Sequence, residues 1–338
     1  MKDGKKTIKG LVIQSSRNII TARVNSSEGC VFYKCGIKGK VLKTDCETYN
    51  PAAPGDWVII EPEEISNNAK SGEVPRAMIL SVEQRRNFYS RYNQKGSSSQ
   101  ILAANTDLVL CVCTPLSPPF RPRFIDRVLL QAEIARIEAA VICNKTDIAR
   151  NDPDVNERLE EYRRIGYKVL YISAKTKEGI KQLNEEIAGK TCVLTGQSGT
   201  GKSSIINALE PELKIKTGQI NEKYDRGVHT TTMPVMYDLS RLKENTFIID
   251  TPGIRRFIPD GIDSDKVINY MREFSPLAGK CSFGMSCSHR TEMGCKILEA
   301  VDAGVIHEDR YESFIRITDD LSQLKQRAQL KQCTQLKR

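Results

Sequence analysis

The stretch GQSGTGKSS, residues 196–204, fits the pattern G-x-x-x-x-G-K-S/T of a loop that wraps nucleotide phosphates. Its glycines let backbone N–H groups converge on phosphate oxygens, and the helix predicted after it adds its positive end. Lys202 is then expected to reach the β- and γ-phosphates, and the Ser203 hydroxyl to bind Mg²⁺. The predicted phosphate-binding residues are Gly196, Gln197, Ser198, Gly199, Thr200, Gly201, Lys202, Ser203 and Ser204.

A second motif, NKTD at residues 144–147, predicts a loop that reads guanine. An ionised aspartate only accepts hydrogen bonds, and guanine offers two adjacent donors, its ring N–H and its exocyclic amine. Asp147 can therefore take a bidentate pair that adenine cannot supply, while Asn144 and Lys145 brace the loop and cover the base. The next predicted strand ends in Ser-Ala-Lys, whose backbone N–H groups can reach the guanine carbonyl. The predicted base-binding residues are Asn144, Lys145, Thr146, Asp147, Ser173, Ala174 and Lys175.

A third motif, DTPG at residues 250–253, follows another apolar strand. Asp250 can hold Mg²⁺ through water, and the Gly253 N–H can sense the γ-phosphate. In an ordinary GTPase the phosphate loop lies near the start of the domain, whereas here the guanine-reading motif comes before it. The elements of a GTP-binding domain are therefore present in a permuted order.

The segment RGVHTTT, residues 226–232, is predicted to complete the Mg²⁺ shell with a threonine when GTP is bound. Thr231 is favoured for this role. Two alternatives stay open: the run also fits the start of a β-strand, and the competing ligands are Thr230 and Thr232.

Catalysis is expected to depend on Lys202 and on a group other than glutamine. Many GTPases orient the attacking water with a glutamine just after D-x-x-G, but here that position is Ile254, which cannot orient water. Either hydrolysis is slow or another side chain helps. His229 is the nearest candidate, since imidazole accepts or donates protons near neutral pH. A structural or partner-contact role for His229 is the alternative.

The hydrophobic pattern predicts a multi-domain chain. Residues 1–85 carry short β-rich runs separated by Gly, Asn, Ser and Pro, which suits a small barrel such as the OB-fold or a different small barrel. Residues 86–99 read as a linker, either of RNA-binding composition or simply solvated. Over residues 100–258 apolar strands alternate with amphipathic helices, as in a parallel α/β sheet. Residues 259–338 are predicted to be mostly helical around a metal site.

Four residues near the carboxyl end predict that metal site. The spacing Cys281-x5-Cys287-x-His289-x5-Cys295 brings three thiols and one imidazole together. Zn²⁺ takes such ligands in a tetrahedron, and four protein ligands make a closed, structural site. Free thiols or a redox pair are the alternatives, and neither explains His289.

Composition adds weaker constraints. The 338 residues carry a formal charge of +9, which favours a polyanionic partner such as RNA or has no meaning by itself. No apolar run of about 20 residues and no signal core occur, so no membrane contact and a cytoplasmic location are expected. The cysteines then read as reduced thiols or metal ligands, and those in apolar runs as small buried side chains: Cys111, Cys113, Cys143 and Cys192.

The order of these motifs resembles the circularly permuted, small-ribosomal-subunit-dependent GTPase A family. The resemblance also covers PGDWV (54–58), ILAANTDLVL (101–110) and FIDRVLLQAE (124–133). It implies an N-terminal OB domain, a central permuted GTPase and a C-terminal zinc domain. It further implies that binding to the small ribosomal subunit and its rRNA stimulates GTP hydrolysis during late maturation of that subunit.

At single positions the resemblance implies a hydrophobic residue at 254 and a catalytic role for His229. One spacing departs from the family, since five residues rather than four separate Cys281 from Cys287. We expect a monomer. Two other classes of protein remain as rivals: a P-loop ATPase or kinase, against which Asp147 argues, and an RNA-binding module with a static nucleotide.

Overall fold

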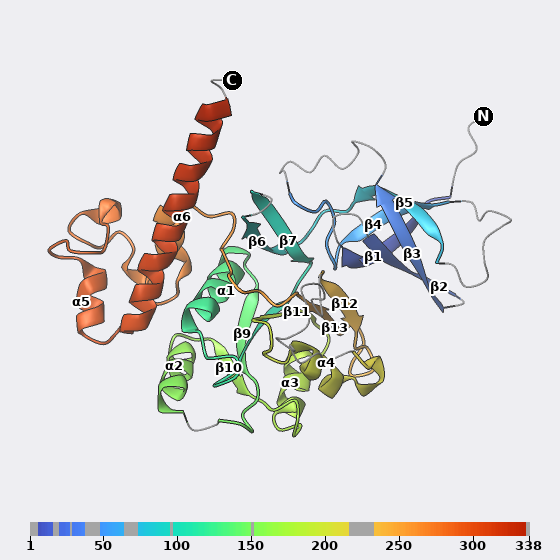
Figure 1. Cartoon of the computed structure of the whole chain (residues 1–338), viewed down its shortest axis with the longest axis horizontal. Coiled ribbons are helices and arrows are strands. Elements are labelled where there is room, and N and C mark those ends of the chain that lie inside the picture. The colour runs from blue at the N-terminus through green and yellow to red at the C-terminus, as the bar shows by residue number, and fades with distance from the viewer. Residues whose placement is uncertain are drawn as a thin grey trace, which may run out of the picture.

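The computed structural model describes residues 6–15, 20–27, 29–37, 48–63, 74–94, 97–149, 152–215 and 233–335. Three parts lie side by side in Figure 1: a blue β-barrel, a central sheet flanked by green and yellow helices, and an orange and red helical part. None of the helices in these ranges is both long enough and apolar enough to cross a bilayer.

The N-terminal part is a closed five-stranded barrel of the OB type. Its strands pair in the order β1-β2-β3-β5-β4, and β1 closes the ring by pairing with β4. Alternate side chains such as Val12, Val58 and Ile79 fill the interior because strand residues alternate between faces. The strands are β1 (Ile8–Ser15), β2 (Ile20–Ser26), β3 (Gly29–Ile37), β4 (Trp57–Pro62) and β5 (Arg76–Val82).

The central part contributes six strands, in the order β10-β9-β8-β11-β13-β12, to a sheet that continues from β12 into β1 of the barrel. Neighbours among these six strands are parallel except β12, which runs antiparallel to β13 and also pairs with β1. The strands are β8 (Leu108–Cys113), β9 (Glu138–Cys143), β10 (Lys168–Tyr171), β11 (Thr191–Gly196), β12 (Val235–Asp238) and β13 (Phe247–Asp250).

Helices cover both faces of this sheet, as the alternating pattern predicted. One hydrophobic cluster packs α1 (Pro122–Ile134) and α2 (Pro153–Arg164) on one face. A second cluster packs α3 (Ile180–Ile187) and α4 (Lys202–Leu209) on the other. Strand β11 lies in the middle of the sheet although it is the fourth of these strands along the chain. The polypeptide order is thus permuted around a conventional parallel sheet.

The segment predicted as a linker, 86–99, is instead structured. Most of it lies in the antiparallel hairpin of β6 (Phe88–Asn93) and β7 (Ser98–Ala104). Tyr89 of β6 is fully buried, and its hydroxyl lies 3.4 Å from the Val128 carbonyl oxygen of α1. The hydroxyls of Ser90 and Ser99 both donate to Asp260, so the hairpin also binds the chain leaving the sheet. The composition of residues 86–99 suggested a linker. Strand pairing and burial instead make them part of a hairpin that connects the central sheet with the C-terminal part.

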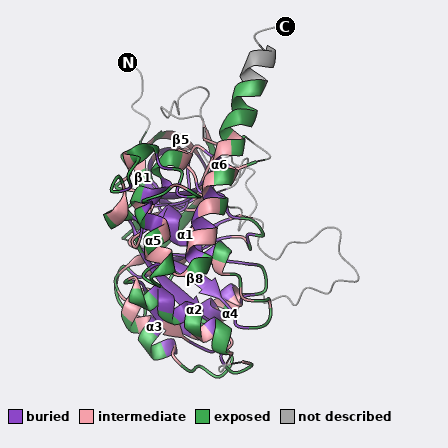
Figure 2. Cartoon of the chain, turned by 90° about the vertical axis from the view of Figure 1, so that its left-hand side faces the viewer, coloured by how far each residue is buried: buried purple, intermediate pink, exposed green. Residues whose placement is uncertain are grey.

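The C-terminal part is held together by helices, 3-10 turns and one hydrophobic cluster, which also includes Leu130 of α1. Helix α6 runs along this cluster and then projects beyond it, where its surface is exposed (Figures 1 and 2). The elements are η3 (Ser264–Tyr270), η4 (Ser275–Leu277), η5 (Gly284–Ser286), α5 (Lys296–Asp302) and α6 (Glu308–Gln335).

A buried polar network joins this part to the central sheet. Asp126 of α1 accepts hydrogen bonds from Arg310 Nη1 at 2.7 Å and from the Tyr162 hydroxyl at 2.6 Å, and also from the Ser313 hydroxyl. Arg310 donates in addition to Glu273 at 2.6 Å. Because buried charges are costly unless paired and hydrogen-bonded, this network favours one docking geometry for the C-terminal part.

Candidate nucleotide and metal sites

The phosphate loop joins the end of β11 to the start of α4, so its chain turns at the carboxyl edge of the sheet. The turn depends on glycine. A Cβ on Gly196 would lie 2.5 Å from the Val112 carbonyl oxygen, and Gly201 has a φ of +87°. Within the loop the Thr200 hydroxyl donates to the Gln197 carbonyl at 2.9 Å. The loop is therefore formed by backbone constraints of this fold.

The NKTD loop, which was predicted to read guanine, is hydrogen-bonded directly to the phosphate loop. The Asn144 side-chain amide donates to the Thr200 carbonyl at 2.8 Å, and Lys145 Nζ donates to the Gly199 carbonyl at 2.7 Å. Asn144 also accepts a hydrogen bond from the Ala174 N–H at 3.1 Å. One buried asparagine thus connects three segments that lie about 30 and 56 positions apart in the sequence.

Asp147 lies at the exposed end of the same loop, beside the second base-binding segment. Its Oδ1 accepts a hydrogen bond from the Ser173 hydroxyl at 2.7 Å, which fixes the orientation of the carboxylate. Ser173 is buried, and its hydroxyl also accepts from the Thr176 N–H at 3.1 Å. Thr146 is held by the Ile172 carbonyl at 3.1 Å. The carboxylate is exposed but oriented, as recognition of a base edge requires.

Lys202 and Asp250 are buried together behind the phosphate loop. Lys202 Nζ donates to the carbonyls of Gly196 and Gln197, each at 3.2 Å, and burial lowers its pKa. Burial raises the pKa of Asp250 to about 6, although the nearby Lys202 opposes this shift. Asp250 Oδ1 is buried without a hydrogen-bond partner among the described residues. A buried ammonium and an orphaned carboxylate oxygen fit a site for an anion and a cation together.

The chain after Asp250 folds back onto the phosphate loop. The Ile254 N–H donates to the Gly196 carbonyl at 3.2 Å, and the Ile254 side chain is buried in the hydrophobic cluster beneath. A Cβ on Gly253 would lie 2.7 Å from the Ser198 Cα, so only glycine allows this approach. Ser203 and Ser204 begin α4 and are partly exposed. The predicted residues His229, Thr230, Thr231 and Thr232 lie outside the described residues.

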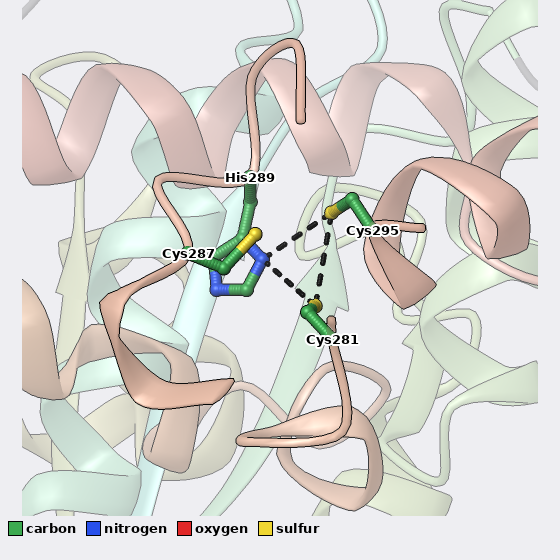
Figure 3. Close-up of side chains that lie close together, drawn as sticks. All are labelled: Cys281, Cys287, His289 and Cys295. Atoms are coloured by element: carbon green, nitrogen blue, oxygen red, sulfur yellow. Dashed lines mark hydrogen bonds between the residues drawn. The ribbon is translucent and has the colours of Figure 1, made fainter. Parts of the chain in front are cut away.

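The four predicted metal ligands come together in the C-terminal part (Figure 3). Their ligand atoms all lie within 4.8 Å of one another. His289 Nδ1 is 3.5 Å from Cys281 Sγ and 3.4 Å from Cys295 Sγ, and these two sulfurs are 3.8 Å apart. A tetrahedron with metal–sulfur bonds of about 2.3 Å and metal–nitrogen bonds of about 2.0 Å has edges of about the same lengths. This cluster could hold a metal ion.

The surroundings of the cluster suit bound thiolates. The Lys296 N–H, at the start of α5, donates to Cys281 Sγ at 3.3 Å. Burial raises the pKa of the Cys287 thiol to about 12, so this thiol stays protonated until a cation offsets its charge. The Tyr311 hydroxyl of α6 donates to the His289 carbonyl at 2.8 Å and holds the loop. The five-residue spacing between Cys281 and Cys287 therefore still allows the four ligands to converge.

Two contributions were missing from the sequence-based prediction. Lys145 was expected to brace its own loop and cover the base, but its hydrogen bond to the phosphate loop was not predicted, since spacing in sequence does not show which loops touch. The network around Asp126 was not recognised, although a signal existed. Asp126 is the one acidic residue among the buried positions of helix α1, most of which are apolar, and such a residue needs a partner.

Comparison with known proteins agrees with this arrangement. The model of the RsgA GTPase family matches residues 82–258. The small ribosomal subunit biogenesis GTPase RsgA 2 of Bacteroides thetaiotaomicron is 34% identical over 324 residues, covering 95% of this chain and 99% of that protein. The small ribosomal subunit biogenesis GTPase RsgA of Borrelia garinii is 35% identical over 302 residues, covering 87% and 91%.

Solved structures share the architecture. The crystal structure of YjeQ from Thermotoga maritima has a TM-score of 0.64 at 27% identity, covering 94% of this chain and 99% of that chain. The crystal structure of YloQ, described as a circularly permuted GTPase, has a TM-score of 0.63 at 20% identity, covering 96% and 98%. The second likeness concerns the fold alone.

Proposed function

This chain belongs to the RsgA GTPase family, and from that premise we propose that it hydrolyses GTP in the biogenesis of the small ribosomal subunit. The relatives at 34% and 35% identity carry that function in their names. The observation that supports it most directly is the pair of hydrogen bonds from Asn144 and Lys145 to the phosphate loop. They hold a guanine-reading loop against a triphosphate cradle, which is what a GTP site needs.

In this proposal the Asp147 carboxylate accepts hydrogen bonds from the ring N–H and the exocyclic amine of guanine. The Lys175 N–H donates a hydrogen bond to the guanine carbonyl oxygen. The N–H groups of Ser173 and Ala174 already donate within the described chain, to Glu178 and Asn144. The phosphates lie on the backbone of residues 196–204, with Lys202 as their counter-charge. Burial weakens the charged form of Lys202, and phosphate oxygens would restore it.

Mg²⁺ fits the residues of this site. Ser203 and Asp250 would hold it, with Thr231, or its neighbours Thr230 and Thr232, as a further ligand. When bound, the ion neutralises charge that develops on the phosphates. The unpartnered Asp250 Oδ1 supports this assignment because a buried carboxylate oxygen otherwise lacks stabilisation. Ile254 is buried and apolar, so His229 is proposed to orient the attacking water.

The cluster of Cys281, Cys287, His289 and Cys295 is proposed to bind one structural Zn²⁺. The donor set is the one that Zn²⁺ prefers in closed sites, and the interatomic distances suit its bond lengths. We also propose rRNA as a contact of the chain on the small subunit, a monomeric state and a cytoplasmic location, because a ribosome-assembly role and a net charge of +9 favour them.

The test is multiple-turnover phosphate release with and without small ribosomal subunits. Lys202→Ala is expected to lower the rate by roughly 100-fold or more, since it removes the cation that faces the transferred phosphate. Lys181→Ala, at an exposed position of α3, is the matched control and is expected to keep the wild-type rate. Equal rates for the two variants would refute the assignment of the site. Equal rates with and without subunits would refute the ribosomal role.

A further inference from the structure

A cavity of about 360 Å³ lies beside the phosphate loop but apart from the GTP cradle. Its walls come from the start of α1, the segment after Ile254 and the first turn of α6. Gln197 is the single predicted GTP-site residue among the described residues that line it. Neither Lys202 nor Asp147 takes part. The cavity is therefore a second concave site next to the nucleotide.

Positive charge dominates this cavity. The one carboxylate among its described lining residues is Asp309, which is 3.6 Å from Arg158 Nε. Helix α1 has no acidic residue in its first turn, so its positive end adds to the local field. The lining arginines are Arg121, Arg123, Arg127, Arg255 and Arg256.

Three of these arginines are held in place by acidic residues of α6. Arg123 pairs with Glu312 at 2.6 Å, while Arg127 and Arg256 share Asp320 at 2.7 Å and 3.1 Å. These pairs connect α1, the segment after Ile254 and α6. They give the cavity fixed walls without neutralising all of its charge.

The remaining arginines are free to bind a ligand. Within the described part of the chain, the guanidinium groups of Arg121 and Arg255 form no ion pair or hydrogen bond, and both residues are exposed. Arg127 is paired through one nitrogen, but its Nη1 is buried without a partner, and its side chain is only 12% exposed. Guanidinium groups in this state suit phosphate oxygens, which accept several short hydrogen bonds.

Aromatic side chains complete the cavity. Phe124 and Phe257 are buried, with ring centroids 6.3 Å apart, and form a rigid base. Phe120 is only partly buried and lines the same cavity. A nucleobase stacks well on an exposed aromatic ring and on guanidinium planes. The volume is at the small end of ligand pockets, which suits one nucleotide and excludes a duplex.

The geometry points to a second nucleotide-binding pocket, in which Arg121 and Arg255 bind the phosphate and Phe120 stacks on the base. The nucleotide comes either from a free nucleoside phosphate or from a single-stranded stretch of RNA. Both sources present the same phosphate and base. The assignment does not depend on the GTP cradle, since no predicted base-binding residue lines this cavity.

The experiment measures binding of a fluorescently labelled short single-stranded RNA to the full chain, with saturating GDP present to fill the cradle. Unlabelled uridine 5′-monophosphate serves as competitor. The double variant Arg121→Gln/Arg255→Gln is expected to bind the RNA about tenfold more weakly or worse. Arg136→Gln/Arg327→Gln removes the same charge at exposed positions outside the cavity and is expected to change affinity by about twofold at most.

Displacement of the RNA by uridine 5′-monophosphate would identify a free nucleotide as sufficient, and binding without displacement would identify RNA as the source. Phe120→Leu is expected to weaken binding severalfold while GDP affinity stays constant. The proposal fails if the wild type binds neither ligand, or if the control variant loses as much affinity as the pocket variant. GDP binding, measured separately, reports on the proposed GTPase function and on folding. If the double variant loses GDP binding, the two single substitutions replace it.

Discussion

The loops around Lys202 and the loops around Cys281 both bring together side chains that are distant in the sequence. They differ in the secondary structure that supports them. The nucleotide loops lie at the ends of buried strands, between two hydrophobic clusters, and are linked to each other by Asn144 and Lys145. The Cys/His loops are built from short 3-10 turns and begin one seven-residue helix. The first site is therefore shaped by the fold, whereas we expect the second to depend on the proposed metal ion for its shape.

Metal removal is expected to have the largest effect. Structural Zn²⁺ contributes about 10–16 kcal/mol of apparent free energy in small zinc domains, so chelation or Cys287→Ser should unfold the loops around the cluster. Hydrogen exchange should rise over residues 281–303, while the emission of Trp57, the single tryptophan, reports an intact barrel. Cys30→Ser, at an exposed thiol of the barrel, is the control. Unchanged exchange after complete metal removal would contradict the comparison.

The second-largest effect is expected from the buried polar network of Asp126 and Arg310, which joins the C-terminal part to the central sheet. Arg310→Met leaves Glu273 buried without its cation and leaves Asp126 with only the longer contact to Arg158, at 3.4 Å. Breaking a buried pair in this way costs about 3–5 kcal/mol. The unfolding free energy of the helical part should fall by that amount in urea titrations followed by circular dichroism. Arg316→Met, whose partner Glu312 lies on the same exposed face of α6, should cost about 1 kcal/mol at most. Equal losses in the two variants would show that the network does not fix the docking.

The smallest expected effect is a pH dependence at the nucleotide site. The pKa of Asp250 is raised to about 6, so this carboxyl favours the folded state at low pH and that contribution is lost as pH rises through about 6. Mg²⁺ binding needs the ionised form. The Mg²⁺-dependent affinity for GDP should therefore fall toward tenfold per pH unit below about pH 6. Asp250→Asn should bind more weakly and remove this dependence, and a wild-type affinity independent of pH would contradict it.

The sequence predicted correctly those parts of the molecule that a hydrophobic periodicity or a short motif defines. Alternating apolar strands and helices gave the parallel sheet, and the barrel and the family were confirmed. Cys281, Cys287, His289 and Cys295 converge as their spacing indicated. In each case the residues that define the feature are neighbours in sequence or follow one repeating period, so no distant contact had to be known.

Features that depend on distant contacts were missed or misread. Residues 86–99 have the composition of a linker, but Tyr89 is buried against α1, and β6 pairs with β7. The arginine-lined cavity joins residues near 121, 255 and 309, which share no motif. Periodicity and motif spacing do not reveal contacts between residues that are distant in the sequence.

The central claim is that the loop of Asp147 and the phosphate loop form one GTP site. The most direct measurement is the nucleotide preference of Asp147→Asn. Asparagine donates where aspartate accepts, and xanthine carries a carbonyl oxygen where guanine carries its exocyclic amine. The variant should lose GTP affinity by about 100-fold and bind xanthosine triphosphate instead. An unchanged preference for GTP over xanthosine triphosphate would contradict the account.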